Sequence, residues 1–402
     1  MKKLFKGLLA LTMAAGLVAC GSTGGKTKVT IWHTYTEDQL EYLEKTVADF
    51  NASQDKYEVV AESQPYDGFT DKVYQAVMAG NGPDMIIHYA SEAAKYVADG
   101  KVVDLSTVLS GDTVALMSEG TKAEATSFAD GKLHILPIVS SGPVFFYNKA
   151  IYSELGLKAP TTWAELQANC EKIKEKYPDK FGFAFDSETD GAQTLIMQTG
   201  NKMFDNDGIY FNTPEVAAQM KYYQDNIQKG LFTNSKVGEY FSEDFNAETL
   251  VSYIGSAAGA PYLKIEYGIG IVPQGGVVEW VPAWNRGMIV FNYNNENRAK
   301  ASGAFIDYFA SPEINAGWCV ACNYPATFKA TMETQTYKDF VAKNESFQYL
   351  NAEHAGAFPA VTAQTHARKA LQTLMSQVAG GTDVNKALEE AVKYIEDELA
   401  AE

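Results

Sequence analysis

Segments typical of β-strands alternate with segments typical of helices through the first hundred residues. Residues 28–32 and 57–61 are rich in β-branched and aromatic side chains, and 85–87 is continuously apolar. Between them, 38–50 and 71–79 repeat apolar residues at helical spacing. A helix between two strands returns the chain across the face of a sheet, so that the strands run parallel. We therefore predict an α/β fold built on mainly parallel sheets.

Later segments continue this pattern less regularly. Further strands are expected at 133–139, 144–149, 269–273 and 288–291. Thr161 or Thr162 is expected to begin a helix, because a glutamate follows at capping-box spacing. The middle of the chain, up to residue 255, reads as rich in helices, and 363–399 reads as two amphipathic helices.

The N-terminus has the pattern of an export signal. Lys2, Lys3 and Lys6 precede an apolar run of about 13 residues, which fits a signal peptide and is too short to span a bilayer. The small residues before Cys20 resemble the lipobox of bacterial lipoproteins, in which this cysteine is lipidated and becomes the new N-terminus. We expect 1–19 to be a lipoprotein signal peptide and 20–27 the lipidated Cys20 with a flexible tether. The protein would then be extracytoplasmic and anchored to the cell membrane; secretion after simple cleavage is the alternative.

Charge limits the partners of the chain. The formal net charge is −17, and it becomes three units more negative once the signal lysines are removed. Such a field repels nucleic acid, so we expect no nucleic-acid partner. The same charge favours a soluble monomer.

Three cysteines remain after the anchor. Cys170, Cys319 and Cys322 are an odd number, which excludes a full disulfide framework. Cys319 and Cys322 have CxxC spacing near the end of an expected helix, so two buried thiols or one local disulfide remain open. No motif indicates a cofactor or a metal site, and neither is expected.

Short motifs follow one another along the whole chain from Cys20. They are Ile31–Thr34, Ala79–Ile86, Pro137-Ile138, Tyr147–Lys149, Pro160–Trp163, Tyr253–Ser256, Ile271–Pro273 and Asn323–Thr327. Their order resembles the extracellular solute-binding proteins of bacterial ABC importers, a group that includes maltose- and glycerol-3-phosphate-binding proteins.

This resemblance implies a type II periplasmic-binding-protein fold, with two α/β lobes that close on a ligand about a hinge. By position, lobe 1 is 28–139 plus 287–325, and lobe 2 is 140–286 plus 326–402. The implied function is a lipid-anchored receptor, not an enzyme. It would capture a carbohydrate or polyol between the lobes and deliver it to the permease subunits of an ABC importer.

Ligands of parallel α/β sheets bind beyond the carboxyl ends of the strands. That rule selects Trp32, His33, Tyr35, Gln64, Tyr66, His88 and Tyr89. The resemblance adds Ser140, Ser141, Ser256, Tyr262, Trp280, Trp284, Arg286 and Tyr324. Aromatic faces beside small polar groups suit a sugar, although each aromatic could instead pack in a core. Trp163 and Trp318 are expected to be core residues.

Two other functions stay open. The His33 motif leans towards the glycerol-3-phosphate branch, and Arg286 could bind a phosphate or carboxylate, unless it pairs with Glu279. However, 353–359 stands where that branch carries an arginine-bearing segment, so a phosphorylated polyol is the alternative ligand. A secreted glycoside-active enzyme is the alternative of another class, because it needs only two suitably spaced carboxylates.

Overall fold

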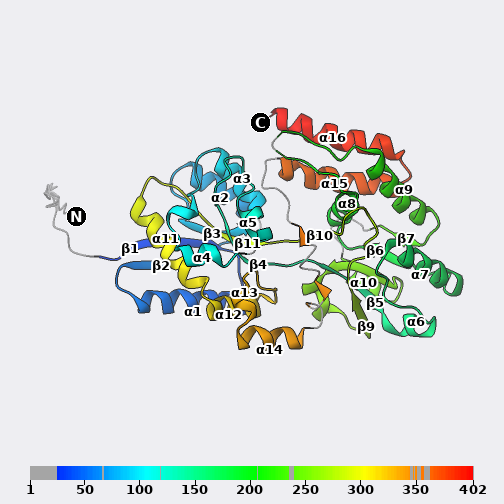
Figure 1. Cartoon of the computed structure of the whole chain (residues 1–402), viewed down its shortest axis with the longest axis horizontal. Coiled ribbons are helices and arrows are strands. Elements are labelled where there is room, and N and C mark those ends of the chain that lie inside the picture. Colours follow the sequence, from blue (N-terminus) through cyan, green and yellow to red (C-terminus); the bar gives the residue numbers. More distant parts are fainter. Residues whose placement is uncertain are drawn as a thin grey trace, which may run out of the picture.

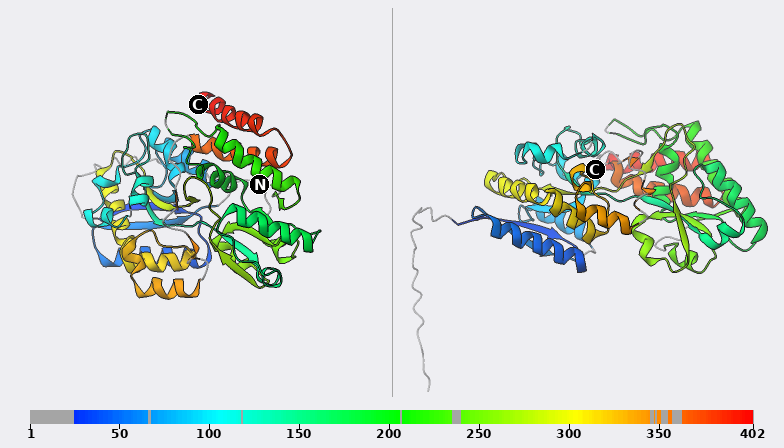
Figure 2. Two further views of the ribbon diagram at one scale, coloured as in Figure 1. Left: turned by 45° about the vertical axis from the view of Figure 1, so that its right-hand side comes forward. Right: turned by 60° about the horizontal axis from the view of Figure 1, so that its bottom comes forward.

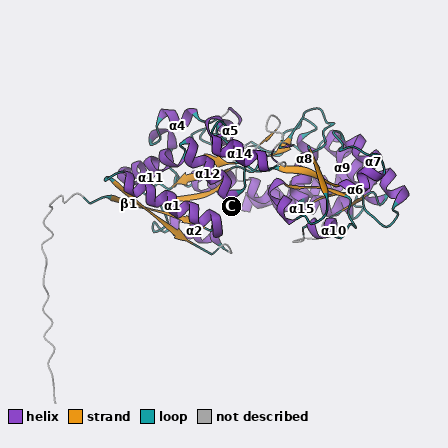
Figure 3. Ribbon diagram, turned by 90° about the horizontal axis from the view of Figure 1, so that it is seen from below, coloured by secondary structure: helices purple, strands orange, loops and turns teal. Residues whose placement is uncertain are grey.

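The computed structural model describes residues 25–65, 68–117, 119–205, 207–234, 240–344, 347, 349–350, 355–356 and 363–401. Two lobes lie side by side, each with a five-stranded sheet inside a shell of helices (Figures 1 and 3). The predicted two-lobe α/β architecture is confirmed. Within the described residues, no helix combines the length and the apolar character that crossing a membrane requires.

The first lobe is built on the sheet β2-β1-β3-β11-β4. Its strands are β1 (Thr27–His33), β2 (Tyr57–Ser63), β3 (Met85–Tyr89), β4 (Leu136–Val139) and β11 (Arg286–Val290). Its helices are α1 (Glu37–Ser53), α2 (Phe69–Met78), α3 (Ala90–Ala98), η1 (Leu105–Thr107), α4 (Gly111–Ala115), α5 (Glu119–Ala125), α11 (Glu296–Phe309), α12 (Pro312–Cys322), α13 (Lys329–Met332) and α14 (Gln335–Lys343). Strands β2, β1 and β3 are parallel, as the alternation predicts, whereas β11 runs antiparallel to β3 and β4. The reversal arises because β11 brings the chain back from the other lobe.

The second lobe is built on the sheet β7-β6-β8-β5-β9. Its strands are β5 (Pro143–Asn148), β6 (Phe183–Phe185), β7 (Phe232–Thr233), β8 (Ser252–Ser256) and β9 (Tyr267–Gly270). Its helices are α6 (Lys149–Glu154), α7 (Trp163–Lys176), α8 (Glu188–Met197), α9 (Pro214–Gln228), α10 (Ser242–Asn246), η2 (Ala257–Tyr262), α15 (Ala363–Ala379) and α16 (Val384–Ala401). Strands β7, β6 and β8 are parallel, and β5 is antiparallel to both β8 and β9.

Successive residues of β5 enter different cores. Phe145 stacks on Phe183 with ring centroids 6.3 Å apart, in the core under α7 and α15. Phe146 points to the opposite face and stacks on Tyr253 at 5.2 Å. This alternation buries both faces of the sheet, which explains why β5 is apolar at nearly every position.

Local signals in the sequence account for several element boundaries. Thr162 caps α7 and Glu165 bonds back to it, so the predicted capping box is confirmed. Trp163 and Trp318 are core residues as expected, with 6% and 0% of their surface exposed. Cys319 and Cys322 are buried free thiols, which decides between the two alternatives for the CxxC pair.

Three strands, β6, β7 and β8, lie in the stretch that the sequence analysis interprets as rich in helices. Strand β6 has three residues and β7 has two, so neither is long enough to show an alternating pattern. The helical periodicity of α7 and α9 dominates the composition of this stretch.

The chain after residue 325 differs from the expected lobe boundary. Helices α13 and α14 pack against α12, and Phe328, Tyr337 and Phe340 are buried in the core of the first lobe. The backbone N–H of Ala326 donates to the Tyr337 hydroxyl at 3.1 Å. Residues 326–344 therefore belong to the first lobe, and the chain enters the second lobe only later, because α15 and α16 pack on α8 and α9.

The segments that cross between the lobes are hydrogen-bonded to one another. The backbone N–H of Ser141 donates to the Trp284 carbonyl at 3.1 Å, and that of Trp284 donates to the Ser141 carbonyl at 2.8 Å. The N–H of Ala283 donates to the carbonyl of Gly356 at 3.0 Å, beside the short pairing of β10 (Val281–Pro282) with β12 (Ala355–Gly356). Figure 2 shows the two lobes from two further directions. We call residues 139–143 and 282–286 the hinge segments.

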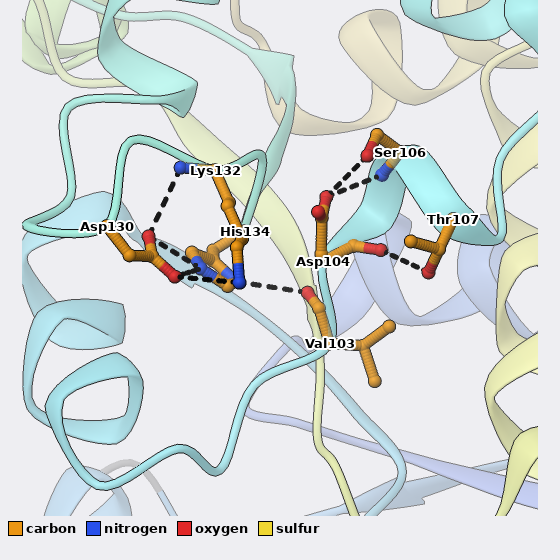
Figure 4. A network of polar contacts seen from close by, with 7 residues as sticks. All are labelled: Val103, Asp104, Ser106, Thr107, Asp130, Lys132 and His134. Atoms are coloured by element: carbon orange, nitrogen blue, oxygen red, sulfur yellow. Dashed lines mark hydrogen bonds and ion pairs between the residues drawn. The ribbon is translucent and has the colours of Figure 1, made fainter.

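A polar network fixes the loop between α5 and β4 (Figure 4). The imidazole of His134 lies 3.1 Å from the Val103 carbonyl and 2.9 Å from the Asp130 carboxylate. The His134 backbone N–H donates to the carbonyl of Ala125, the last residue of α5, at 3.3 Å. This network sets the position of α5, which contributes Glu124 to the cavity described next.

Candidate ligand-binding site

A cavity of about 730 Å³ opens between the two lobes. The first lobe contributes Tyr89 and the start of α3, together with Glu124 of α5. The second lobe contributes the ends of β6 and β8, the start of α8 and one face of α15. Trp284 and Asn285 line the cavity from a hinge segment.

Strand ends position most of these groups. Tyr89 is the last residue of β3, and Ser256 is the last residue of β8. Strand β6 ends at Phe185, three residues before α8 begins. The carboxyl ends of neighbouring parallel strands lie at one edge of a sheet, which is where α/β proteins place their ligands.

Three carboxyl groups after β6 form one wall of the cavity, which we call the acidic wall: Asp186, Glu188 and Asp190. Asp186 accepts the backbone N–H of Phe241 at 2.7 Å. Asp190 accepts the indole N–H of Trp284 at 3.2 Å. Glu188, which is 4% exposed, accepts hydrogen bonds at Oε1 from the Asn234 amide at 2.5 Å and the Ser376 hydroxyl at 2.9 Å. Its other oxygen, Oε2, is buried and has no hydrogen-bond partner.

Burial changes the titration of the acids around the cavity. Burial, together with a smaller contribution from the charge of Asp190, raises the pKa of Asp186 to about 6. Burial also raises the pKa of Asp190. Glu124 accepts a hydrogen bond from the Asn285 amide, but burial dominates and raises its pKa to about 7. Burial therefore destabilises the ionised forms of Asp186, Asp190 and Glu124.

The hinge dipeptide Trp284-Asn285 contacts both lobes. The Trp284 indole donates to Asp190 of the second lobe, whereas the Asn285 amide donates to Glu124 of the first lobe. The rings of Tyr89 and Trp284 thus lie in the lining together with groups that accept hydrogen bonds.

Helix α15 lines the remaining side with polar residues. Gln364, Arg368 and Gln372 are spaced four residues apart, which places them on one helix face, and Lys369 lies beside them. The Thr189 hydroxyl at the start of α8 donates to the Arg368 carbonyl at 3.3 Å. Helix α15 also contacts α3 of the other lobe, so the lobes approach each other beside the cavity.

A second group of residues lies around Arg286, next to the cavity; we call Arg286, Tyr35, Tyr89 and Tyr324 the arginine corner. The guanidinium lies 5.0 Å from the centre of the Tyr89 ring. Burial opposes the charge of Arg286, but the nearby hydroxyls of Tyr89, Tyr35 and Tyr324 raise its pKa, so the guanidinium stays charged. Within the described residues, no carboxylate forms an ion pair with Arg286.

The sequence matches the family model of bacterial extracellular solute-binding proteins over residues 45–348. The chain belongs to this family.

The sequence of this solute-binding protein is similar to those of known binding proteins. The sn-glycerol-3-phosphate-binding periplasmic protein UgpB of Escherichia coli K12 is 24% identical over 360 residues, covering 83% of this chain and 82% of UgpB. A putative binding protein of Brucella abortus is 27% identical over 285 residues, covering 67% of this chain and 68% of that protein.

Solved structures share the fold over almost the whole chain. The cyclic alpha-maltosyl-1,6-maltose binding protein of Arthrobacter globiformis has a TM-score of 0.81 at 23% identity, covering 92% of this chain and 98% of its own. UgpB of Mycobacterium tuberculosis, solved with glycerophosphocholine, has a TM-score of 0.77 at 16% identity. The match covers 94% of this chain and 99% of that UgpB.

Three of the residues selected from the sequence line the cavity of this solute-binding protein: Tyr89, Ser256 and Trp284. Tyr35, Arg286 and Tyr324 lie in the arginine corner. Of the serines in the hinge, Ser140 donates its backbone N–H to Pro325 at 2.9 Å, and the buried Ser141 pairs with Trp284.

The first-strand and second-strand residues lie outside the cavity lining. The Trp32 indole donates to Glu62 at 2.8 Å, and Gln64 accepts a hydrogen bond from Lys72 at 2.5 Å. His33 is 2% exposed, and burial lowers its pKa.

The other selected residues have three different environments. His88 accepts the Tyr89 backbone N–H at 2.9 Å, and burial lowers its pKa to about 3, with a further contribution from Arg286. Trp280 is buried in the core of the second lobe, where the Gln274 side chain accepts its backbone N–H. Tyr262 is 71% exposed, whereas Tyr66, residues 20–24 of the tether and most of 353–359 lie outside the described residues.

The sequence analysis misses the acidic wall, Glu124, Asn285 and the polar face of α15. One signal for the acidic wall is present in the sequence: Asp186 directly follows the apolar triplet Phe183–Phe185. Treating that triplet as a strand would have selected Asp186 by the same strand-end rule that selects Tyr89.

Proposed function

We propose that this solute-binding protein is the carbohydrate receptor of an ABC importer, held at the outer face of the cell membrane by a lipid on Cys20. The observation that carries the proposal is the interlobe cavity, in which aromatic rings lie beside hydrogen-bond acceptors. Its volume of about 730 Å³ falls in the range typical of small-molecule sites.

A sugar matches both features of the lining. The faces of Tyr89 and Trp284 offer surfaces for the C–H face of a pyranose ring. Carboxylates of the acidic wall accept hydrogen bonds from hydroxyl groups, and such charge-assisted bonds are stronger than neutral ones. The structural neighbour that binds cyclic alpha-maltosyl-1,6-maltose supports this choice of ligand class.

Ligand capture would be coupled to closure about the hinge segments. A ligand that contacts both lobes stabilises the closed form by its differential affinity for that form. The permease would then recognise the closed, loaded receptor. Because Trp284 lies in a hinge segment and in the cavity lining, it is placed to connect the two events.

Thermal unfolding with a panel of sugars, polyols and phosphorylated polyols tests the proposal. A ligand present at 100 times its Kd should stabilise the protein by about 2.7 kcal/mol. Stabilisation by at least one saccharide supports the carbohydrate receptor. A panel in which no saccharide changes the unfolding temperature contradicts it.

The lipid anchor has its own test. The full-length protein should partition into the detergent phase of Triton X-114 when expressed in a bacterium, and the Cys20→Ser variant should not. Equal partitioning of both forms would show that Cys20 carries no lipid.

A phosphorylated polyol is the second candidate ligand. It is favoured by the UgpB relatives and by the charge of Arg286, which has no carboxylate partner in the described residues. The acidic wall opposes it, because Asp186, Glu188 and Asp190 repel a phosphate that enters the cavity.

We propose binding rather than catalysis, in line with the relatives, which are binding proteins. A glycosidase would need two of the cavity carboxyl groups to act as acid and nucleophile or base. Release of a reducing sugar from a panel of glycosides would overturn this part of the proposal.

A further inference from the structure

The acidic wall holds negative charge that the protein neutralises only in part. The hydrogen-bond donors that reach Asp186, Glu188 and Asp190 are a backbone amide, two side-chain groups and an indole, all uncharged. Within the described residues, no lysine, arginine or histidine forms an ion pair with any of the three, although the charge of Arg368 across the cavity lowers the pKa of Asp190 and partly offsets the effect of burial. A buried charge without an ion-pair partner costs several kcal/mol. The ionised carboxylates of the acidic wall therefore need another source of stabilisation.

The dipole of helix α8 stabilises part of this negative charge. Glu188 and Asp190 lie in its first turn, where the helix dipole favours negative charge by about 0.3–1 kcal/mol. This is too small to compensate three acids, and Asp186 lies outside the helix. Glu188 most clearly lacks compensation, because it is 4% exposed, lines the cavity and has one oxygen without a hydrogen-bond partner.

A bound metal ion does not explain the cluster. Among the residues that the structure describes, no group of three or more histidine, cysteine, aspartate or glutamate side chains is placed to hold one. The basic side chains that line the cavity, Arg368 and Lys369, are exposed on α15.

Aromatic rings complete the environment. Tyr89, Trp284 and Tyr240 line the same cavity as the acids. Aromatic faces attract cations through their quadrupoles, and carboxylates add hydrogen bonds to an ammonium group. Rings and carboxylates in one cavity thus form an environment that suits an organic cation.

We infer that the solute carries a protonated amine, as an amino sugar or aminocyclitol does, and that the acidic wall binds this group. The inference rests on the proposed function, since it names the class of saccharide that the cavity takes. The sugar ring would lie against Trp284, with its ammonium group directed to Glu188 and its neighbours. Ammonium and carboxylate then neutralise each other inside the closed cavity.

Matched disaccharides test this inference by titration calorimetry on the intact protein. The probes are glucosamine disaccharides with α-1,4 and β-1,4 linkages, the glucose disaccharides of the same linkages and the N-acetylated forms. We expect at least one amine form to bind 10-fold or more tightly than its glucose and N-acetyl counterparts. Its affinity should also fall with added salt, because screening weakens the ion pair.

Variants identify the acid that carries the effect. Glu188→Gln keeps the shape of the side chain and an oxygen for Asn234 and Ser376, and should weaken amine binding by about 10- to 100-fold. Glu175→Gln is the matched control, because Glu175 is exposed on α7, at the outer side of the second lobe in Figure 1. It removes the same charge and should leave the affinity within 2-fold. If Glu188→Gln unfolds at a lower temperature, Asp186→Asn serves as the second variant.

The outcomes separate this inference from the proposed function. Equal or tighter binding of a neutral disaccharide overturns the amine inference and leaves the carbohydrate receptor intact. Failure of every amine probe, while other saccharides stabilise the protein, also overturns only the inference. If no saccharide binds at all, the proposed function fails with it.

Discussion

The two lobes present opposite charges beside the same cavity. On the second lobe, Glu188 and its neighbours in the acidic wall are bonded to neutral donors. On the first lobe, Arg286 is a buried cation surrounded by phenol groups. Neither Arg286 nor the acidic wall forms an ion pair among the described residues, and the acidic wall lines the cavity whereas Arg286 does not. We therefore expect the second lobe to select the ligand, and Arg286 mainly to organise the first lobe.

The largest expected effect comes from Trp284, which lies between the two regions. Trp284→Ala removes the ring from the cavity and the donor from Asp190, and should weaken ligand binding by about 2–4 kcal/mol. Trp284→Phe keeps an aromatic ring but removes the indole N–H, and should weaken ligand binding less than Trp284→Ala does. Calorimetric Kd values measure both, and an unchanged Kd for Trp284→Ala would show that the ring does not contact the ligand.

The pH dependence of stability tests Glu124, the buried acid that the first lobe contributes to the cavity lining. Burial raises the pKa of Glu124 from 4.5 to about 7, so between these values the folded protein holds a proton that the unfolded chain has released. This contribution to stability is complete below pH 4.5 and is lost as the pH rises through 7. A shift of this size corresponds to about 3 kcal/mol.

Glu124→Gln should remove that dependence, since an amide does not titrate and can still accept a hydrogen bond from Asn285. Urea unfolding at pH 5 and pH 8 should show a smaller loss of stability for Glu124→Gln than for the unmodified protein. Parallel profiles for the two proteins would mean that Glu124 titrates normally in the fold.

A moderate effect is expected in the arginine corner. Arg286→Lys keeps the charge but loses the planar group over Tyr89, which should lower the free energy of unfolding by about 1 kcal/mol. Its affinity for a saccharide should change less than 3-fold. A 10-fold loss of affinity would place Arg286 in contact with the ligand and favour an anionic solute.

The smallest effect is expected at Gln64, which the strand-end rule selects but which contacts Lys72 away from the cavity. Gln64→Ala should leave the Kd within 2-fold. A larger change would mean that the ligand extends beyond the described cavity towards β2.

The sequence predicts the architecture better than the site. Helices such as α1 and α15 are long enough for their periodicity to be clear, and strands β1, β2 and β3 follow from the alternation at the start of the chain. The strand-end rule finds Tyr89 because β3 is a five-residue apolar strand with a clear end. It misses Asp186 because β6, with three residues, is hidden among helices.

Trp280 and Trp284 show a further limit. Both are tryptophans just before the crossing to β11, and the sequence does not distinguish them. The structure buries Trp280 in the core of the second lobe, whereas Trp284 lines the cavity and its backbone pairs with Ser141 in the hinge. Which ring meets the ligand thus depends on the packing of segments far apart in the chain.

Small-angle X-ray scattering with and without a saturating ligand tests closure of the two lobes most directly. A ligand held by both lobes should favour the closed form, so the radius of gyration should fall on binding and recover when the ligand is removed. Identical scattering curves for the empty and saturated protein would contradict an account in which the solute is captured by closure about the hinge.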